Sequence, residues 1–130
     1  MRRATVCLAI LILPWMVAGS ILAGTQLTQV SVDQAKEMIQ KHGGTADFVV
    51  LDVRTPQEFA EGHLPSGVNL NLMTPDFGRR LAAMDRSKTY LVYCRTGNRS
   101  AKAIQIMERL GFQSVNHMYE GIVGWQKKGF

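Results

Sequence analysis

Apolar runs and amphipathic stretches alternate along most of this chain. The run at 48–53 stays apolar until Asp52, which is typical of a buried parallel strand. Apolar or alternating runs predict further strands at 68–72, 89–93 and within 112–118. Apolar residues at helical spacing predict the intervening helices, at 31–42, 55–61, 74–84, 100–110 and 121–129. Strands that alternate with helices indicate an α/β fold, with a central, mostly parallel sheet and helices on both faces.

Capping residues mark where three of these helices begin. Ser31 and Thr55 are each followed, three residues later, by Gln or Glu, which is the spacing of a capping box. Thr74 precedes a proline as Thr55 does, and proline is favoured at the first helical position. Residues 24–30 form either a polar linker or a short edge strand. We divide this part of the chain into a linker at 24–30 and one domain at 31–130.

Residues 1–23 have the pattern of a leader. Arg2 and Arg3 precede residues 4–23, which carry no charged side chain. Small residues near its end favour a cleaved signal peptide, but a helix of this length also spans a bilayer core of roughly 30 Å, as an N-terminal membrane anchor would. Either way the domain is expected outside the cytoplasm, periplasmic or extracellular, or anchored to the inner membrane. Membrane contact is expected only if the leader is uncleaved.

Charge and cysteine content exclude several classes of protein. The net charge is +5, and without Arg2 and Arg3 the chain has 13 basic and 10 acidic residues. This balance is too weak for a nucleic-acid-binding surface, so we expect no nucleic-acid partner. Of the two cysteines, Cys7 lies in the leader, so cleavage would leave Cys94 alone and exclude an intramolecular disulfide. One cysteine and three dispersed histidines have no metal-ligand spacing, and we expect neither metal nor cofactor.

Cys94 lies between a predicted strand and a predicted helix. A short polar loop with Gly97 and two arginines follows it. Unpaired backbone N–H groups converge at such a point, and together with the helix dipole and the guanidinium groups they favour a thiolate. An inert, buried cysteine is the simpler alternative, but the electropositive surroundings favour a reactive one.

Four segments together resemble the rhodanese family. They are residues 51–59, 62–69, 93–101 and 121–125, in that order. Residues 93–101, Tyr-Cys-Arg-Thr-Gly-Asn-Arg-Ser-Ala, are similar to the family's active-site loop. Residues 121–125 are similar to its closing Gly-Gly-Ile-x-x-Trp segment. Glu120 stands where the family has the first of those glycines, and we expect this difference to affect a turn and not the chemistry.

The resemblance implies a sulfurtransferase that carries a persulfide on Cys94. The sulfane sulfur would come from a small anionic donor such as thiosulfate and pass to a thiol, sulfite or cyanide acceptor, with a protein among the candidate acceptors. The loop that follows the catalytic cysteine would bind the substrate, through Arg95, Thr96, Gly97, Asn98, Arg99 and Ser100. The residues expected to support this loop are Asp52, Arg54, Glu58 and His63.

Each of these residues has an expected role. Backbone amides of residues 95–100 would cradle the sulfane sulfur, and Arg95 would point outwards to meet an anionic donor. Arg99 would brace the loop against a carboxylate, with Asp52 and Glu58 as the two candidates; Glu58 is alternatively a capping residue alone. Arg54 would form a structural ion pair rather than contact the substrate, which is the alternative. His63 would support the site from behind without acting as a general base.

Three other functions compete with this one. Cysteine-dependent phosphatases and rhodanese-like arsenate reductases have five residues between cysteine and arginine, whereas four separate Cys94 from Arg99. The shorter loop fits one sulfur atom better than a tetrahedral oxyanion. Many rhodanese-like domains lack the cysteine and only bind partners, but here Cys94 and both arginines are present. A redox sensor remains a further alternative, for which the domain holds no resolving cysteine.

Overall fold

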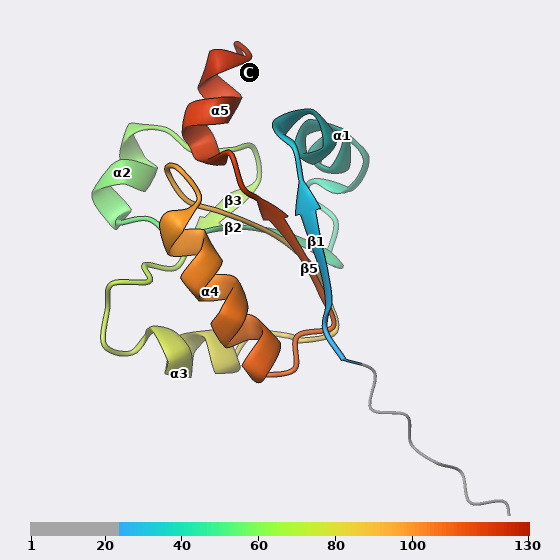
Figure 1. Ribbon diagram of the computed structural model, residues 1–130, viewed down its shortest axis with the longest axis vertical. Helices are drawn as coiled ribbons and strands as arrows, with labels where there is room; N and C mark the ends of the chain where they lie inside the picture. Colours follow the sequence, from blue (N-terminus) through green and yellow to red (C-terminus); the bar gives the residue numbers. More distant parts are fainter. Residues whose placement is uncertain (1–23) are drawn as a thin grey trace, which may run out of the picture.

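A five-stranded parallel sheet forms the centre of the protein, in a computed structural model that describes residues 24–130 (Figure 1). The strand order is β1-β5-β4-β2-β3, and every neighbouring pair is parallel. The strands are β1 (Gln26–Val30), β2 (Phe48–Asp52), β3 (Gly67–Asn69), β4 (Thr89–Tyr93) and β5 (Ser114–Met118). The helices are α1 (Val32–His42), α2 (Pro56–Glu61), α3 (Phe77–Ala82), α4 (Asn98–Arg109) and α5 (Gly121–Lys127).

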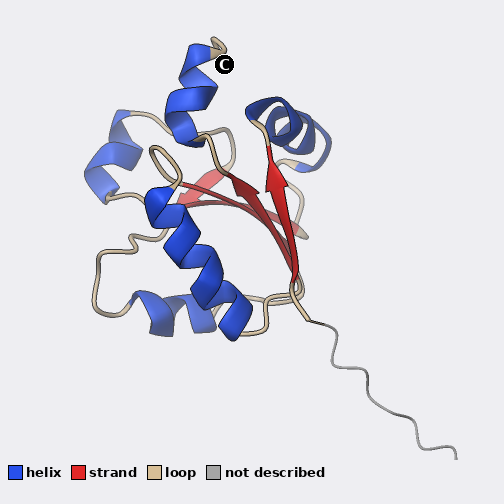
Figure 2. Ribbon diagram, viewed as in Figure 1, coloured by secondary structure: helices blue, strands red, loops and turns tan. Residues whose placement is uncertain are grey.

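Helices cover both faces of this sheet, as Figure 2 shows. The core beneath α3 and α4 contains Leu51 and Val92 from the sheet and Met107 from α4. The opposite core holds α1 and α5 against the other face, with Ile39 and Trp125 buried. Alternate residues of each strand belong to alternate cores, because successive side chains of a strand point to opposite faces. The predicted α/β architecture is therefore confirmed.

Residues 26–30 form a strand and not a linker. β1 pairs in parallel with β5 along its whole length, from Gln26 opposite Ser114 to Val30 opposite Met118. Of the two alternatives for this stretch, the edge strand is correct. The predicted signal peptide or membrane anchor at 1–23 lies outside the described residues. In residues 24–130, no helix is both long enough and apolar enough to span a bilayer.

Two of the three predicted helix starts are confirmed. Ser31 and Thr55 both complete capping boxes, each with its side chain accepting from a backbone N–H three residues on. The prediction for Thr74 is wrong, because α3 begins at Phe77, after Asp76. The Thr74 hydroxyl instead donates to the carbonyl of Asn71 at 2.9 Å, so it stabilises the preceding turn.

Glu120, which stands where the resemblance places a glycine, connects the end of β5 to the start of α1. Its Oε1 accepts from the backbone N–H of Val32 at 3.2 Å, an otherwise unpaired donor at a helix start. The backbone at Glu120 is helical and strains no turn. Gly121 carries the special conformation, with φ +66°, and a Cβ there would collide with the carbonyl oxygen of Arg95. The position that requires glycine is therefore 121, and this chain has glycine there.

Candidate active site

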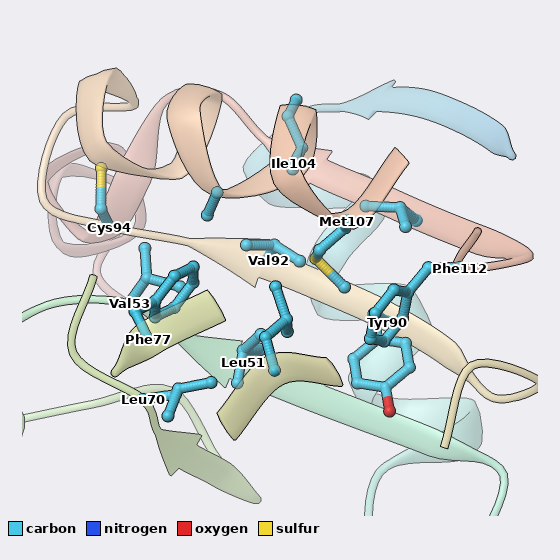
Figure 3. Close-up of a cluster of buried hydrophobic side chains, with 13 residues drawn as sticks. Leu51, Val53, Leu70, Phe77, Tyr90, Val92, Cys94, Ile104, Met107 and Phe112 are labelled. Carbon is cyan, nitrogen blue, oxygen red and sulfur yellow. The ribbon is translucent and has the colours of Figure 1, made fainter. Parts of the chain in front are cut away.

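Cys94 follows β4 directly, at the carboxyl edge of the sheet. Cys94 is 1% exposed and packs in the core beneath α3 and α4. Figure 3 shows it beside Val53 and Phe77, at the opposite end of that core from Tyr90 and Phe112. Carboxyl ends of strands form the ligand-binding edge of parallel α/β sheets. The predicted nucleophile is thus in the position where such sheets place their sites.

The sulfur of Cys94 accepts hydrogen bonds from the loop that follows it. The backbone N–H of Gly97 donates at 3.1 Å, and the Ser100 hydroxyl lies 3.3 Å from the sulfur. Burial raises the pKa of the Cys94 thiol, but the Ser100 side chain and the backbone amides of Ser100, Gly97 and Thr96 outweigh it, so the net effect is a lowered pKa. The thiolate therefore forms more readily in this site than in a free cysteine.

The loop wraps the sulfur because α4 begins earlier than its pattern predicts. The helix starts at Asn98, two residues before the expected Ser100, and Gly97 precedes it with φ +98°. This left-handed residue turns the chain so that its own amide and the first turn of α4 face the sulfur. The side chains of Arg95, Thr96 and Asn98 are exposed. Within the predicted cradle, the structure thus brings Gly97 and Ser100 to the sulfur and leaves the Arg95 and Asn98 side chains outside.

Arg99 pairs with Glu58, which decides between the two candidate carboxylates. Its two terminal nitrogens donate to the two carboxylate oxygens of Glu58 at 2.7 and 2.9 Å. Glu58 also accepts from the backbone N–H of Thr55, so capping and bracing are combined in one side chain. Hydrogen bonding from Arg99 is the main cause that lowers the pKa of Glu58 to about 2. The active-site loop is therefore tied to the start of α2.

This ion pair predicts a pH-dependent contribution to stability. Glu58 stays charged in the folded chain down to about pH 2, whereas the unfolded chain takes up the proton near 4.5. The stabilisation is therefore complete above the unfolded pKa and is lost as pH falls toward 2. We expect Glu58→Gln to lower the free energy of unfolding at neutral pH by about 1 kcal/mol, and the difference from wild type to shrink as pH falls through this range in urea titrations.

The exposed pair of Asp76 with Arg79 supplies the matched control for that measurement. Its atoms lie 3.2 Å apart, on side chains that are 40% and 80% exposed. Asp76→Asn should change stability by only a few tenths of a kcal/mol. A Glu58→Gln effect that is equally small at every pH would show that the brace contributes nothing to folding.

Asp52 and Arg54 form the second ion pair, on the other face of the sheet. Arg54 donates to both carboxylate oxygens of Asp52 and to the carbonyl of Gly62. Asp52 is fully buried and lies opposite Tyr93 in the ladder, whose ring belongs to the core beneath α1 and α5. Its side chain therefore points away from the face that holds Cys94. The ion pair predicted for Arg54 is present, and Asp52 is not the partner of Arg99.

His63 packs against α2. Its ring stacks on Phe59 with centroids 3.8 Å apart, and its Nδ1 lies 2.9 Å from the carbonyl oxygen of the same residue. These contacts hold the connection between α2 and β3. They tie His63 to α2, and its expected role in supporting the site stays a prediction.

One residue of the site was missed in the sequence. His117 on β5 is buried, and its Nε2 lies 2.7 Å from the Ser100 hydroxyl that also contacts the Cys94 sulfur. Its Nδ1 lies 2.9 Å from Oε1 of Gln29 on β1. One signal in the sequence could have found it. His117 comes two positions after the apolar Val115, and residues two apart on a strand point to the same face, so a polar side chain is expected in the core there.

A hollow of about 290 Å³ adjoins the loop. Arg54, Glu58, Glu61 and Gly62 line it on the α2 side, and Arg95, Ile122, Val123 and Gln126 line it on the other. The backbone N–H of Ile122 donates to the carbonyl of Cys94 at 2.9 Å, and this contact holds α5 against the loop. The exposed guanidinium of Arg95 thus borders a space large enough for a small anion.

Comparison with known proteins gives a consistent match. The model of the rhodanese-like domain family matches residues 31–128. A sulfurtransferase of Allochromatium vinosum is 27% identical over 95 residues, covering 73% of this chain and 87% of its own length. The chloroplastic thiosulfate sulfurtransferase 16 of Arabidopsis thaliana is 34% identical over 112 residues, covering 78% and 89%. The crystal structure of a rhodanese-related protein from Thermoplasma volcanium is 28% identical, with a TM-score of 0.66 over 79% of this chain and 94% of that one.

Proposed function

Because the chain belongs to the rhodanese-like domain family, we propose that it is a sulfurtransferase that moves a sulfane sulfur through a Cys94 persulfide. The donor is thiosulfate or a similar small anion, and the acceptor is a thiol, sulfite or cyanide, or a protein thiol. One observation carries this proposal: the Cys94 sulfur accepts hydrogen bonds from the Gly97 amide and the Ser100 side chain at the start of α4. These donors stabilise a thiolate where a sulfur nucleophile is needed.

The reaction proceeds in two displacements at sulfur. The Cys94 thiolate attacks the outer sulfur of thiosulfate, a new S–S bond forms, and the S–S bond of thiosulfate breaks as sulfite leaves with the electron pair. The acceptor then attacks the terminal sulfur of the persulfide; with cyanide the product is thiocyanate, and the Cys94 thiolate is regenerated. The amide of Gly97 and the hydroxyl of Ser100 are placed to stabilise negative charge on sulfur in both steps.

The relatives support this choice of chemistry. The Allochromatium protein is named a sulfurtransferase and the Arabidopsis protein a thiosulfate sulfurtransferase. The nucleophile, the four-residue gap to Arg99 and the Glu58 brace in this chain are suited to the same reaction. A non-enzymatic binding or redox-sensing module is the alternative.

Arg95 is the side chain proposed to attract the donor. It is exposed and borders the hollow next to the loop, so its charge can act on an approaching anion without holding the loop in place. We expect Arg95→Ala to raise KM for thiosulfate about tenfold, with a smaller effect on kcat, and Arg95→Lys to be intermediate. Steady-state kinetics measure this.

Arg80→Ala is the matched control, since Arg80 is also an exposed arginine but lies on α3. It should leave both constants unchanged. An Arg95→Ala protein with the wild-type KM would remove Arg95 from donor binding.

Two assays on the same preparation test the proposed function against the phosphatase alternative. The first measures thiocyanate formed from thiosulfate and cyanide, and the second measures hydrolysis of an aryl phosphate. We expect turnover in the first assay alone. Turnover of the phosphate ester without thiocyanate formation would contradict the proposal, and inactivity in both would favour the binding module.

We further propose that the protein is exported. Arg2 and Arg3 precede residues 4–23, which carry no charged side chain. A positively charged start followed by an uncharged, apolar stretch is typical of a leader that directs export. The mass of the protein purified from its native host distinguishes the cleaved from the anchored form, and its recovery in a cytoplasmic fraction with residues 1–23 intact would contradict both.

A further inference from the structure

His117 lies in a row of side chains that the sheet register aligns. Gln29 on β1 and Val92 on β4 are its partners in the two ladders, and paired residues of parallel strands point to the same face. Val92 and Cys94, two residues apart, share the core beneath α3 and α4. The sheet therefore holds Gln29, His117 and Cys94 on one face, with Ser100 in the first turn of α4 next to them.

These side chains form a continuous relay of hydrogen bonds, which runs from Gln29 through His117 and Ser100 to Cys94. His117 is bonded to Gln29 Oε1 through Nδ1 (2.9 Å) and to Ser100 Oγ through Nε2 (2.7 Å). The same Oγ lies 3.3 Å from the Cys94 sulfur. Because Gln29 Oε1 can only accept, Nδ1 carries the proton of the neutral ring, and Nε2 is an acceptor directed at Ser100.

We propose that His117 is a positioning residue for Cys94: it takes up the thiol proton through the Ser100 hydroxyl and holds it as an imidazolium while the thiolate acts. The inference rests on the proposed function, because it gives the proton of that nucleophile a destination inside the protein. A buried histidine bonded at both nitrogens could serve packing alone. Here, however, one of its two partners also contacts the sulfur, which packing alone does not require.

The protons balance in this transfer. While Cys94 is a thiol, it donates to Ser100 Oγ and the hydroxyl proton points to Nε2 of His117; the opposite direction, from the Ser100 hydroxyl to the sulfur, belongs to the thiolate. The thiol proton then moves to Oγ and the hydroxyl proton moves to Nε2, so Ser100 keeps one proton, Cys94 loses one and His117 gains one. Afterwards the hydroxyl donates to the thiolate, and the imidazolium donates from both nitrogens, to Ser100 and to Gln29. Every polar side-chain atom that takes part in this relay has a hydrogen-bond partner in both states.

The surroundings of His117 suit this transfer. Burial lowers the pKa of His117 and keeps the ring neutral, as a proton acceptor must be. β1 presents the Gln29 amide, α4 the Ser100 hydroxyl, and β4 Val92 with the Cys94 thiol. Cys94 is thus the titratable group that faces the ring from these elements. A thiolate there offsets the cost of burying the imidazolium, so the two groups titrate as a pair.

The first test measures alkylation of Cys94 by iodoacetamide as a function of pH. It uses the full chain with Cys7→Ser, in which Cys94 is the single thiol. His117→Gln keeps a hydrogen-bonding side chain but cannot take up the proton, so we expect the alkylation midpoint to move to higher pH and the rate near pH 7 to fall about tenfold. His42→Gln, at an exposed histidine that ends α1, is the control and should change neither. An unchanged profile in folded His117→Gln would overturn the proposal.

The second test needs no substitution within the relay. Nitrogen-15 NMR of the His117 ring reports its tautomer and charge across pH, before and after Cys94 is alkylated. We expect the neutral ring to carry its proton on Nδ1 and its titration to change on alkylation. A proton on Nε2 instead, or a titration that ignores alkylation, would contradict the relay. Neither test involves sulfur transfer, so failure of the relay and failure of the proposed function are separately visible.

Discussion

Cys94→Ser is expected to abolish transfer of sulfur from thiosulfate to cyanide, with a loss of roughly a thousandfold or more. A serine hydroxyl is not ionised by the hydrogen bonds that lower the pKa of the Cys94 thiol, and it cannot form the S–S bond of a persulfide. The change is nearly isosteric, and the loop should keep its structure. Thiocyanate formation by the purified variant measures the effect.

Cys7→Ser is the control for that substitution, because it removes the other cysteine of the chain. It should retain wild-type activity. Residual transfer by Cys94→Ser at more than background, or loss of activity in Cys7→Ser, would contradict the assignment of the nucleophile.

Gly97→Ala is expected to reduce activity about a hundredfold, because the loop must shift to accommodate it. Gly97 has φ +98°, and a Cβ there would collide with the carbonyl oxygen of Tyr119. The amide that would be displaced is the one that donates to the Cys94 sulfur at 3.1 Å. Thiol pKa and sulfur transfer should change together, since both depend on this donor.

Gly111→Ala separates backbone strain from this collision. Gly111 also has a positive φ, +80°, but a Cβ there would meet open space. Both substitutions should lower the free energy of unfolding by about 1–2 kcal/mol through the left-handed backbone. Only Gly97→Ala should change activity, and equal activity in the two variants would show that the close approach to Tyr119 is not needed for the site.

Local patterns predicted most of the fold, and their failures have tertiary causes. Thr55 and Thr74 have the same Thr-Pro sequence, yet only Thr55 caps a helix. The Thr74 hydroxyl binds the carbonyl of Asn71 instead, and the buried Phe77 begins α3. Residues 26–30 are mostly polar and exposed, so their pattern cannot distinguish a linker from an edge strand. Pairing with β5, which comes much later in the sequence, makes them a strand.

The site was predictable where its residues are consecutive. The loop from Cys94 to Ser100 could be placed because a strand, a polar turn and a helix follow one another there. The choice between Asp52 and Glu58 for Arg99 required side-chain directions, and Asp52 points to the other face. His117 and Gln29 could not be found without the strand order, because only the sheet brings β1, β5 and β4 together.

The most direct test of sulfur transfer through Cys94 is the mass of the intact protein after incubation with thiosulfate. We expect wild type to gain one sulfur atom, located on Cys94 by peptide mapping, and to lose it when cyanide or a thiol is added. Cys94→Ser should gain nothing under the same conditions. A wild-type protein that gains no sulfur, or that gains it elsewhere than on Cys94, would contradict the persulfide mechanism.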